Sequence, residues 1–367
     1  MSVSEEFVSS DAANEIFGER MILSQSRLEC FKDCPQSYYL KYVLSLDDGE
    51  DVKISPSDVG NFVHKILEEF LSEVKAKNID YPIDEEWTKE TAERLIADYI
   101  KAVSPENAGG RLAYLFSRVT RSLMLYIASL NREFSQSRFK PYDFEMKVGN
   151  DALPPLEIPL GDGSVMSLIG IVDRLDSYRE DDKVYIRVAD YKTGTKKFSL
   201  EEVVGGRNVQ LLLYLFSICG CPDCDFRREI APKGEELIPA GAVYFSARPG
   251  EATSASPVSR EDAKGIVEKA ISRTGIVLED EDIIRAMEPL GEGKYIPASF
   301  KKDGTLSARS SVASREQMDE IRDALCKAIA EAGIKMRSGE CSASPEDHDG
   351  RSPCEYCKMR PVCRRDS

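Results

Sequence analysis

The sequence has few of the features that mark several protein classes. It contains only two histidines, His64 and His348, too far apart in the chain for a zinc site of two cysteines and two histidines. No apolar run approaches the ~20 residues of a membrane helix, and the longest, such as 211–218, are much shorter. The first residues, MSVSEEFVSSD, lack the basic and apolar regions of a signal peptide. We therefore expect neither export nor membrane insertion, and a cytoplasmic location.

A phosphate-binding loop for nucleotide hydrolysis is also missing. The nearest stretch, 291–294, reads Gly-Glu-Gly-Lys and lacks the spacing of the motif G-x4-G-K-[ST]. We therefore expect no nucleotide binding or hydrolysis on this chain. Disorder is excluded as well, because 42% of the 367 residues are hydrophobic, which is ample material for a buried core.

The net charge of −15 is unusual for a protein that binds nucleic acid, but the charge is unevenly distributed. Residues 111–147 carry seven basic side chains against three acidic ones, a local balance of +4. The last seventeen residues are also rich in arginine. A basic track that contacts DNA phosphates, including Arg118 and Arg121, is one interpretation, and a solvated surface is the other.

Ten cysteines without an export signal indicate metal ligands or buried thiols rather than disulfides. Three of them form the pattern C-x2-C-x5-C at the end of the chain. The groups are Cys354, Cys357 and Cys363 at the end, Cys30 and Cys34 near the start, and Cys219, Cys221 and Cys224 in the middle, with Cys326 and Cys341 standing alone.

The first half of the chain predicts helices. Ser26 and Glu29 have the spacing of a capping box, and the helix that they begin is expected to kink at Pro35. A second helix is predicted over 60–74, with His64 at the edge of its apolar stripe. Residues 87–134 predict two or more further helices with a break at 107–110.

After residue 134 the spacing of apolar residues changes from the helical pattern to one typical of strands. Strands are predicted over 144–148, 165–175 and 184–191, and the polar stretch 179–183 predicts a hairpin turn between the last two. A strand is also predicted over 240–246. Helices are predicted over 209–218, 260–273 and 315–333. This mixture indicates an α/β protein.

Asp190 and Lys192 end an apolar strand and project to the same face, because side chains alternate along a strand. Across the predicted hairpin, Asp173 would lie opposite 189 or 190, within metal-bridging reach of Asp190. Two carboxylates and a lysine suit Mg²⁺-dependent hydrolysis of a phosphodiester. Other acid-x-Lys pairs in the chain are better explained as solvated surface pairs, and a structural ion pair is the alternative here too.

The order of these motifs resembles that of a known family. The sequence is similar to the RecB-like branch of the PD-(D/E)XK nucleases, and within it to the nuclease half of the AddB subunits of AddAB helicase–nucleases. The motifs, in order, are Ser24-Gln-Ser-Arg-Leu-Glu with Cys34-Pro35, Gly60-x3-His64-x2-Leu67-Glu68, Gly170-x2-Asp173-Arg-x-Asp176, Asp190-Tyr-Lys-Thr-Gly194, Gln210-x3-Tyr214 and the terminal C-x2-C-x5-C.

The resemblance implies a restriction-endonuclease-like core with a mixed central sheet flanked by helices. It implies a catalytic set of Asp173, Asp190 and Lys192, and a Mg²⁺ site made by His64, Asp173, Asp190 and the main-chain carbonyl of Tyr191. Gln210 and Tyr214 match a motif associated with DNA and with support of the active site. Glu145 lies where such nucleases sometimes carry a further acid.

The resemblance also implies a [4Fe–4S] cluster held by Cys34, Cys354, Cys357 and Cys363, which would staple the two ends of the domain. Zinc is the competing ion, since four thiolates also suit it, and Cys30 is the alternative fourth ligand.

One nuclease domain with five parts is expected. They are an N-terminal segment (1–46), a helical region with the histidine motif (47–140), a catalytic core (141–250), a helical or irregular extension (251–340) and a cluster tail (341–367).

The expected function is that of a deoxyribonuclease on single-stranded DNA, working with an AddA-type helicase–nuclease partner in double-strand break repair by homologous recombination. Two alternatives stay open. One is a DNA-end-binding scaffold that holds a cluster but does not cleave, and the other is a CRISPR-associated cluster nuclease.

Overall fold

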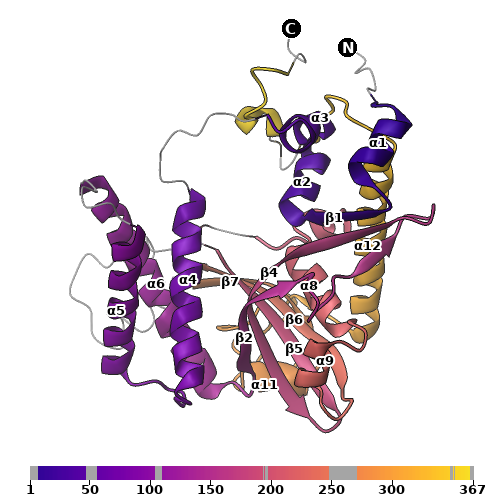
Figure 1. Cartoon of the computed structure of the whole chain (residues 1–367). Coiled ribbons are helices and arrows are strands. Elements are labelled where there is room, and N and C mark those ends of the chain that lie inside the picture. The colour runs from indigo at the N-terminus through magenta and orange to yellow at the C-terminus, as the bar shows by residue number, and fades with distance from the viewer. Residues whose placement is uncertain are drawn as a thin grey trace.

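The computed structural model describes residues 7–46, 56–103, 110–192, 194, 197–247, 271–347, 350 and 352–363. Within these residues, eight strands form one mixed sheet, in the order β1-β4-β5-β6-β7-β8, with β2 and β3 also paired to β4. Helices lie on both sides of this sheet (Figure 1). The chain is therefore of the α/β class, as the sequence predicts. None of the described helices has the length and apolar character needed to span a membrane.

The long strand β4 organises the sheet, because four other strands pair with it. It forms a hairpin with β5, as predicted, and β5 then pairs with β6 in parallel. The strands are β1 (Arg20–Ser24), β2 (Lys140–Val148), β3 (Glu157–Pro159), β4 (Val165–Glu180), β5 (Lys183–Lys192), β6 (Glu236–Ala247), β7 (Ile271–Leu278) and β8 (Val312–Ala313).

Helices occur along the whole described part of the chain. They are α1 (Ser10–Phe17), α2 (Gln25–Asp33), α3 (Pro35–Tyr38), the π-helical turn η1 (Tyr39–Val43), α4 (Pro56–Ala76), α5 (Glu85–Val103), α6 (Gly110–Gln136), α7 (Leu200–Val204), α8 (Gln210–Cys219), α9 (Asp225–Ile230), α11 (Glu281–Met287), α12 (Arg315–Arg337) and the 3₁₀ turn η3 (Pro353–Tyr356).

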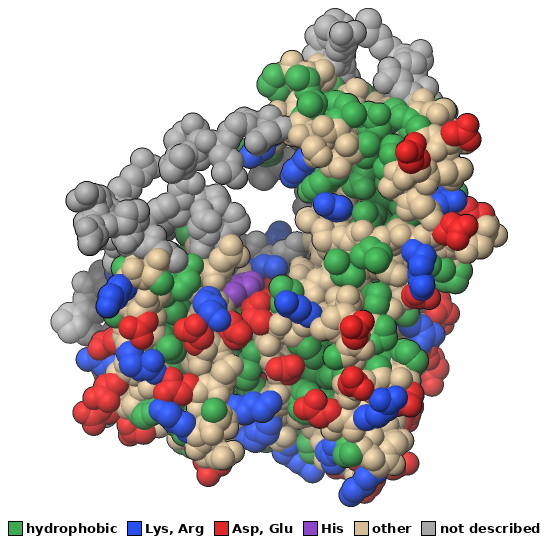
Figure 2. All heavy atoms as spheres, in the orientation of Figure 1, with side chains coloured by type: hydrophobic (Ala, Val, Ile, Leu, Met, Phe, Trp, Pro, Cys, Tyr) green, Lys and Arg blue, Asp and Glu red, His purple; other side chains and the backbone are tan. Residues whose placement is uncertain are grey.

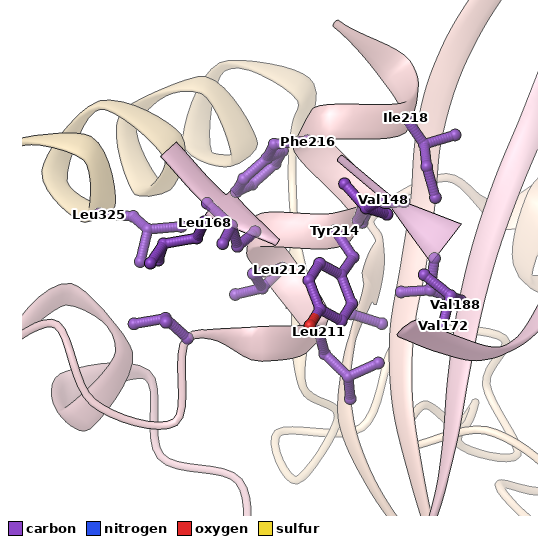
Figure 3. Close-up of a cluster of buried hydrophobic side chains, with 14 of the residues drawn as sticks. Val148, Leu168, Val172, Val188, Leu211, Leu212, Tyr214, Phe216, Ile218 and Leu325 are labelled. Carbon is purple, nitrogen blue, oxygen red and sulfur yellow. The ribbon is translucent and has the colours of Figure 1, made fainter. Parts of the chain in front are cut away.

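Two hydrophobic cores lie on the two faces of the sheet. One is built from α8, α12 and α2 against β4 and β5, and Figure 3 shows Leu212 and Tyr214 of α8 in one cluster with Leu168, Val172 and Val188. The other is built from α4, α5 and α6 against the opposite face. In Figure 1 these three helices stand beside the sheet as a separate block. The strands β4 and β5 are thus enclosed by helices from distant parts of the chain.

Two predictions of local structure are wrong. The helix that contains Ser26 begins at Gln25 with Ser24 as its cap, and Ser26 Oγ bonds Ser24 Oγ instead of forming a capping box with Glu29. The predicted helix over 260–273 conflicts with β7, which begins at Ile271 and pairs antiparallel with β6; residues 260–270 lie outside the described residues. Tertiary pairing thus outweighs the helical pattern at 271–273.

Candidate metal-binding hydrolytic site

The two aspartates singled out in the sequence lie where β4 and β5 separate. Arg174 and Ala189 form the pair of the hairpin that lies farthest from its turn. Asp173 and Asp190 therefore lie just beyond the last paired residues, opposite one another. Both carboxyl groups are buried, with 7% and 4% of each residue exposed. The predicted register is therefore confirmed.

His64 projects from α4 onto the main chain of β5. Its Nε2 atom is 2.7 Å from the Tyr191 carbonyl oxygen, and its Nδ1 atom is 3.4 Å from Asp173 Oδ1. Because a carbonyl oxygen only accepts hydrogen bonds, Nε2 carries a proton. Burial lowers the pKa of His64, which favours the neutral ring with a lone pair on Nδ1 that faces the carboxylate. Such an arrangement suits a cation between them.

Glu145 completes this group from β2. Its carboxylate is 3.9 Å from His64 Nδ1, and ligand atoms of His64, Glu145 and Asp173 all lie within 4.8 Å of one another. Its backbone has a φ of 46°, which is rare for a residue other than glycine and is costly in a strand. The strained backbone therefore turns the Glu145 carboxylate toward the other two residues.

The acidic groups are held in an environment that disfavours their negative charge. Burial, followed by the charge of Asp190, raises the pKa of Asp173 well above its ordinary value. Burial, followed by the charge of Glu68, raises the pKa of Glu145 to about 7. A bound cation would relieve both effects, because it stabilises the ionised carboxylates. The donors are two carboxylates, one imidazole and a nearby carbonyl, a set that fits a divalent metal ion.

Lys192 reaches toward solvent from the same edge. Its Nζ atom is 2.6 Å from Asp190 Oδ2, and its side chain is 32% exposed whereas that of Asp190 is 5% exposed. The ammonium group therefore lies between the buried carboxylate and the open side of the site. In Figure 2 a histidine side chain lies in a hollow with charged side chains around it.

Gln210 and Tyr214 support the strand that carries Asp173. Both are on α8, where Tyr214 is 3% exposed and its hydroxyl lies near the Gln210 side chain and the Ile171 backbone. A Cβ atom on Gly170 would lie 1.5 Å from the Tyr214 hydroxyl. The glycine therefore permits α8 to approach β4 three residues before Asp173, and the buried tyrosine is placed for support rather than for contact with DNA.

Comparison with known proteins decides the family. A family model described as the PD-(D/E)XK nuclease superfamily matches residues 22–364 of the chain. The chain belongs to this superfamily.

The curated relatives are larger proteins. The chain is 31% identical over 368 residues to a protein of Clostridium acetobutylicum named as the B subunit of an ATP-dependent helicase/deoxyribonuclease, covering 99% of this chain and 31% of that protein. Proteins of the same name from Clostridium novyi and Caldanaerobacter subterraneus are 31% and 30% identical, and the chain covers 32% and 30% of them. It therefore spans about a third of the length of these curated relatives.

In this PD-(D/E)XK nuclease, a group of buried ions lies on the sheet face opposite to Asp173 and Asp190. Arg174 donates to Asp176 at 2.8 Å and also to the Tyr191 hydroxyl. Arg187 donates to Asp176 at 2.7 Å and to Glu133 of α6 at 2.6 Å. All four charged side chains have no exposed surface.

This buried group connects to the candidate site through Tyr191. While the Tyr191 ring contacts Arg174, its backbone N–H donates to Asp173 at 2.7 Å and its carbonyl faces His64. Glu133 and Arg187 were not among the residues predicted from the sequence. The signal for Arg187 was available, because a charged residue inside the apolar strand 184–189 requires buried partners. Glu133, on a distant helix, had no comparable signal.

The predicted cluster cysteines of the nuclease line one cavity of about 720 Å³ between the α2–α3 corner and the C-terminal segment. In Figure 1 the turn η3 lies beside α3. Cys363 Sγ is 2.9 Å from Gln36 Oε1, and Cys357 Sγ is 3.8 Å from the Ser37 hydroxyl. Five cysteines line this cavity, namely Cys30, Cys34, Cys354, Cys357 and Cys363. Among the described residues, no three of their sulfur atoms lie as close together as the three ligand atoms at His64.

The predicted DNA contacts lie on α6. Arg121 is exposed, and the side chain of Arg118 lies outside the described part of the structure. Further along α6, the Tyr126 hydroxyl donates to the Lys192 carbonyl at 2.6 Å. The helix that carries the basic residues is thus bonded to the end of β5.

Proposed function

We propose that this chain hydrolyses phosphodiester bonds of single-stranded DNA, as the nuclease module of a helicase–nuclease. The observation that supports this most directly is the group of His64, Glu145 and Asp173 beside the Asp190–Lys192 pair. The names of the relatives support DNA as the substrate and a helicase as the partner. We place this activity in the cytoplasm, together with an AddA-type partner, in double-strand break repair by homologous recombination.

We assign the metal site to His64, Glu145, Asp173, Asp190 and the Tyr191 carbonyl, with Mg²⁺ as the ion. When bound, the ion supplies positive charge that stabilises the charge developing on the phosphate oxygens. The chain itself supplies Lys192, whose ammonium group orients the attacking water. Water adds to phosphorus and loses a proton, the bond to the leaving sugar oxygen breaks, and that oxygen gains a proton.

We place a [4Fe–4S] cluster in the cysteine cavity, with zinc as the competing ion. The four thiolates that such a cluster requires can all come from the lining of this one cavity. We assign Cys34, Cys354, Cys357 and Cys363 as ligands. Since hydrolysis transfers no electrons, the cluster would supply a covalent connection between the ends of the domain rather than redox chemistry.

The proposed function predicts the behaviour of Asp190→Ala. Loss of this carboxylate should abolish Mg²⁺-dependent cleavage of labelled single-stranded DNA, because Lys192 loses its partner and the ion loses a ligand. DNA affinity measured in EDTA should stay close to that of the wild type. Asp225→Ala, which removes an exposed aspartate of α9, is the matched control and should cleave normally.

Two outcomes would contradict the proposal. Cleavage by Asp190→Ala at the wild-type rate would move the active site elsewhere. Wild-type protein that binds DNA but does not cleave it with any divalent ion would favour the scaffold function.

A further inference from the structure

A second cavity lies beside residues 273–275 of β7. It has a volume of about 340 Å³ and is bounded by β7, the segment 292–299, the segment 309–311 and Phe198. No role follows for it from the metal site or from the cysteine cavity.

The strand registers place this cavity next to the candidate active site. Asp190 pairs with Tyr244 on β6, and Tyr244 pairs with Thr274 on β7, which lines the cavity. Paired residues on neighbouring strands share a face, so Thr274 is two strand spacings, about 10 Å, from Asp190 on the same side. The Lys192 ammonium lies 5.8 Å from the centre of the Tyr244 ring, between the two sites. A DNA strand at Lys192 therefore passes close to the cavity.

The cavity walls are connected to one another by hydrogen bonds. Ser299 N donates to Ser310 Oγ at 2.9 Å, and that hydroxyl donates to the Ser299 carbonyl at 3.1 Å. Ser311 N donates to the Pro297 carbonyl at 2.8 Å. Two loops that are separate in sequence are thus held together, which means that the cavity is formed before any ligand enters.

The lining combines an aromatic ring with basic and hydroxyl groups. Phe198 is half-buried, Arg309 is exposed, and Arg273 stacks 5.6 Å from the Phe245 ring centre at the cavity edge. The one acidic residue among the described residues of the lining, Glu292, is paired with Lys294 at 2.6 Å. The lining is thus basic on a chain whose net charge is −15. An aromatic face for a base and guanidinium groups for a phosphate are the elements of single-strand binding sites.

We propose that this cavity binds a nucleotide of the DNA strand next to the scissile phosphate. The base stacks on Phe198, and Arg309 contacts the neighbouring phosphate. This inference rests on the proposed nuclease function, since it places the same strand across both sites. The subsite holds the strand in register with Lys192. It recognises the strand by shape and charge rather than by base identity.

The test measures the affinity of the full chain for fluorescein-labelled oligo(dT) in EDTA, so that no cleavage occurs. Phe198→Leu keeps an apolar side chain but removes the aromatic face, and binding should weaken about 5- to 150-fold, the range for loss of one base–aromatic stack. Phe198→Tyr restores the ring and should bind like the wild type. Arg309→Ala should reduce the slope of log affinity against log salt by about 0.7, the value for one contact with single-stranded DNA.

Matched controls separate the subsite from general charge effects. Arg228→Ala removes an exposed arginine of α9 that is not among the residues lining the cavity, and it should leave both affinity and salt slope unchanged. Wild-type affinity in both Phe198→Leu and Arg309→Ala would overturn the subsite. Free dTMP that binds as tightly as oligo(dT) would also overturn it, because the cavity would then recognise a mononucleotide rather than a chain.

Failure of the subsite and failure of the nuclease function give different results. If the wild type cleaves with Mg²⁺ but the two variants bind normally, the subsite is wrong and the function stands. If the variants bind weakly but no divalent ion supports cleavage, the strand-binding site stands and the nuclease function is wrong.

Discussion

At the scale of single residues, Gly170 determines how closely α8 approaches the catalytic strand. A methyl group there would overlap the Tyr214 hydroxyl, so Gly170→Ala should destabilise the fold by about 1–3 kcal/mol, as overpacking does. Cleavage should fall as well, because β4 carries Asp173 three residues later. Denaturant unfolding and a cleavage assay measure the two effects.

Two further variants establish the cause of this effect. Tyr214→Ala combined with Gly170→Ala should cost less stability than the sum of the two single variants, because the overlapping group is gone. Gly60→Ala is the control, since a Cβ atom at Gly60 of α4 meets no atom within 4 Å. Strict additivity of the Gly170 and Tyr214 effects would contradict the close contact as the reason for the glycine.

At the scale of secondary-structure elements, the hairpin β4–β5 carries different chemistry on its two faces. Asp173 and Asp190 open toward the site, while Arg174, Asp176 and Arg187 are sealed against α6. Asp176→Ala should cost about 3–5 kcal/mol of stability, because it leaves two buried guanidinium groups without their main carboxylate. Equilibrium unfolding in urea measures this change.

An exposed ion pair provides the comparison for that buried group. Glu236→Ala breaks the pair between Glu236 and Arg315, whose side chains are about half exposed, and should cost no more than about 1 kcal/mol. A similarly small cost for Asp176→Ala would show that the buried ions do not hold the hairpin to α6.

The helix α6 is the predicted contact for DNA phosphates. Replacing Arg118 and Arg121 with glutamate should weaken binding to all sequences alike, because phosphate contacts carry no base information. Affinity should also fall steeply with salt in the wild type and less steeply in the variant. Titrations of labelled DNA at several salt concentrations measure this, and an affinity that is independent of salt would exclude the basic track.

At the scale of the whole molecule, the ends of the chain meet around the cysteine cavity. Protein contacts also join them, since Gln36 N donates to Ser342 O at 3.1 Å, and Arg207 donates both to the Lys32 carbonyl at 3.0 Å and to Glu346 at 2.8 Å. A cluster would add a covalent connection across a loop of ~320 residues, and the chain-entropy estimate gives about 6 kcal/mol of stabilisation for a cross-link of that span.

Cys363→Ala should therefore give colourless, protease-sensitive protein, whereas wild type purified without oxygen should be brown with about four iron atoms per chain. Cys326→Ala, which changes a cysteine of α12 outside the cavity, should keep the iron. Iron analysis and limited proteolysis measure both properties. Stoichiometric zinc without iron would refute the cluster, and a fully stable Cys363→Ala protein would refute its stapling role.

The sequence by itself was sufficient for features that depend on short segments. The turn at 179–183 and the alternation of side chains placed Asp173 opposite Asp190, because a hairpin register follows from its turn. It failed at β7, where Ser272, Arg273, Thr274 and Gly275 interrupt the apolar pattern of a strand. The order of the motifs along the chain also identified the family, which the family model confirms over 22–364.

Only the tertiary structure decided which distant segments meet. Glu145 joins His64 and Asp173 because its own strained backbone turns its side chain toward them. Glu133 reaches Arg187 because α6 packs on the sheet. The cavity beside Phe198 likewise depends on two loops that are bonded to one another. Such contacts follow from the packing of helices on a sheet, and their geometry is set by long-range burial rather than by local residue patterns.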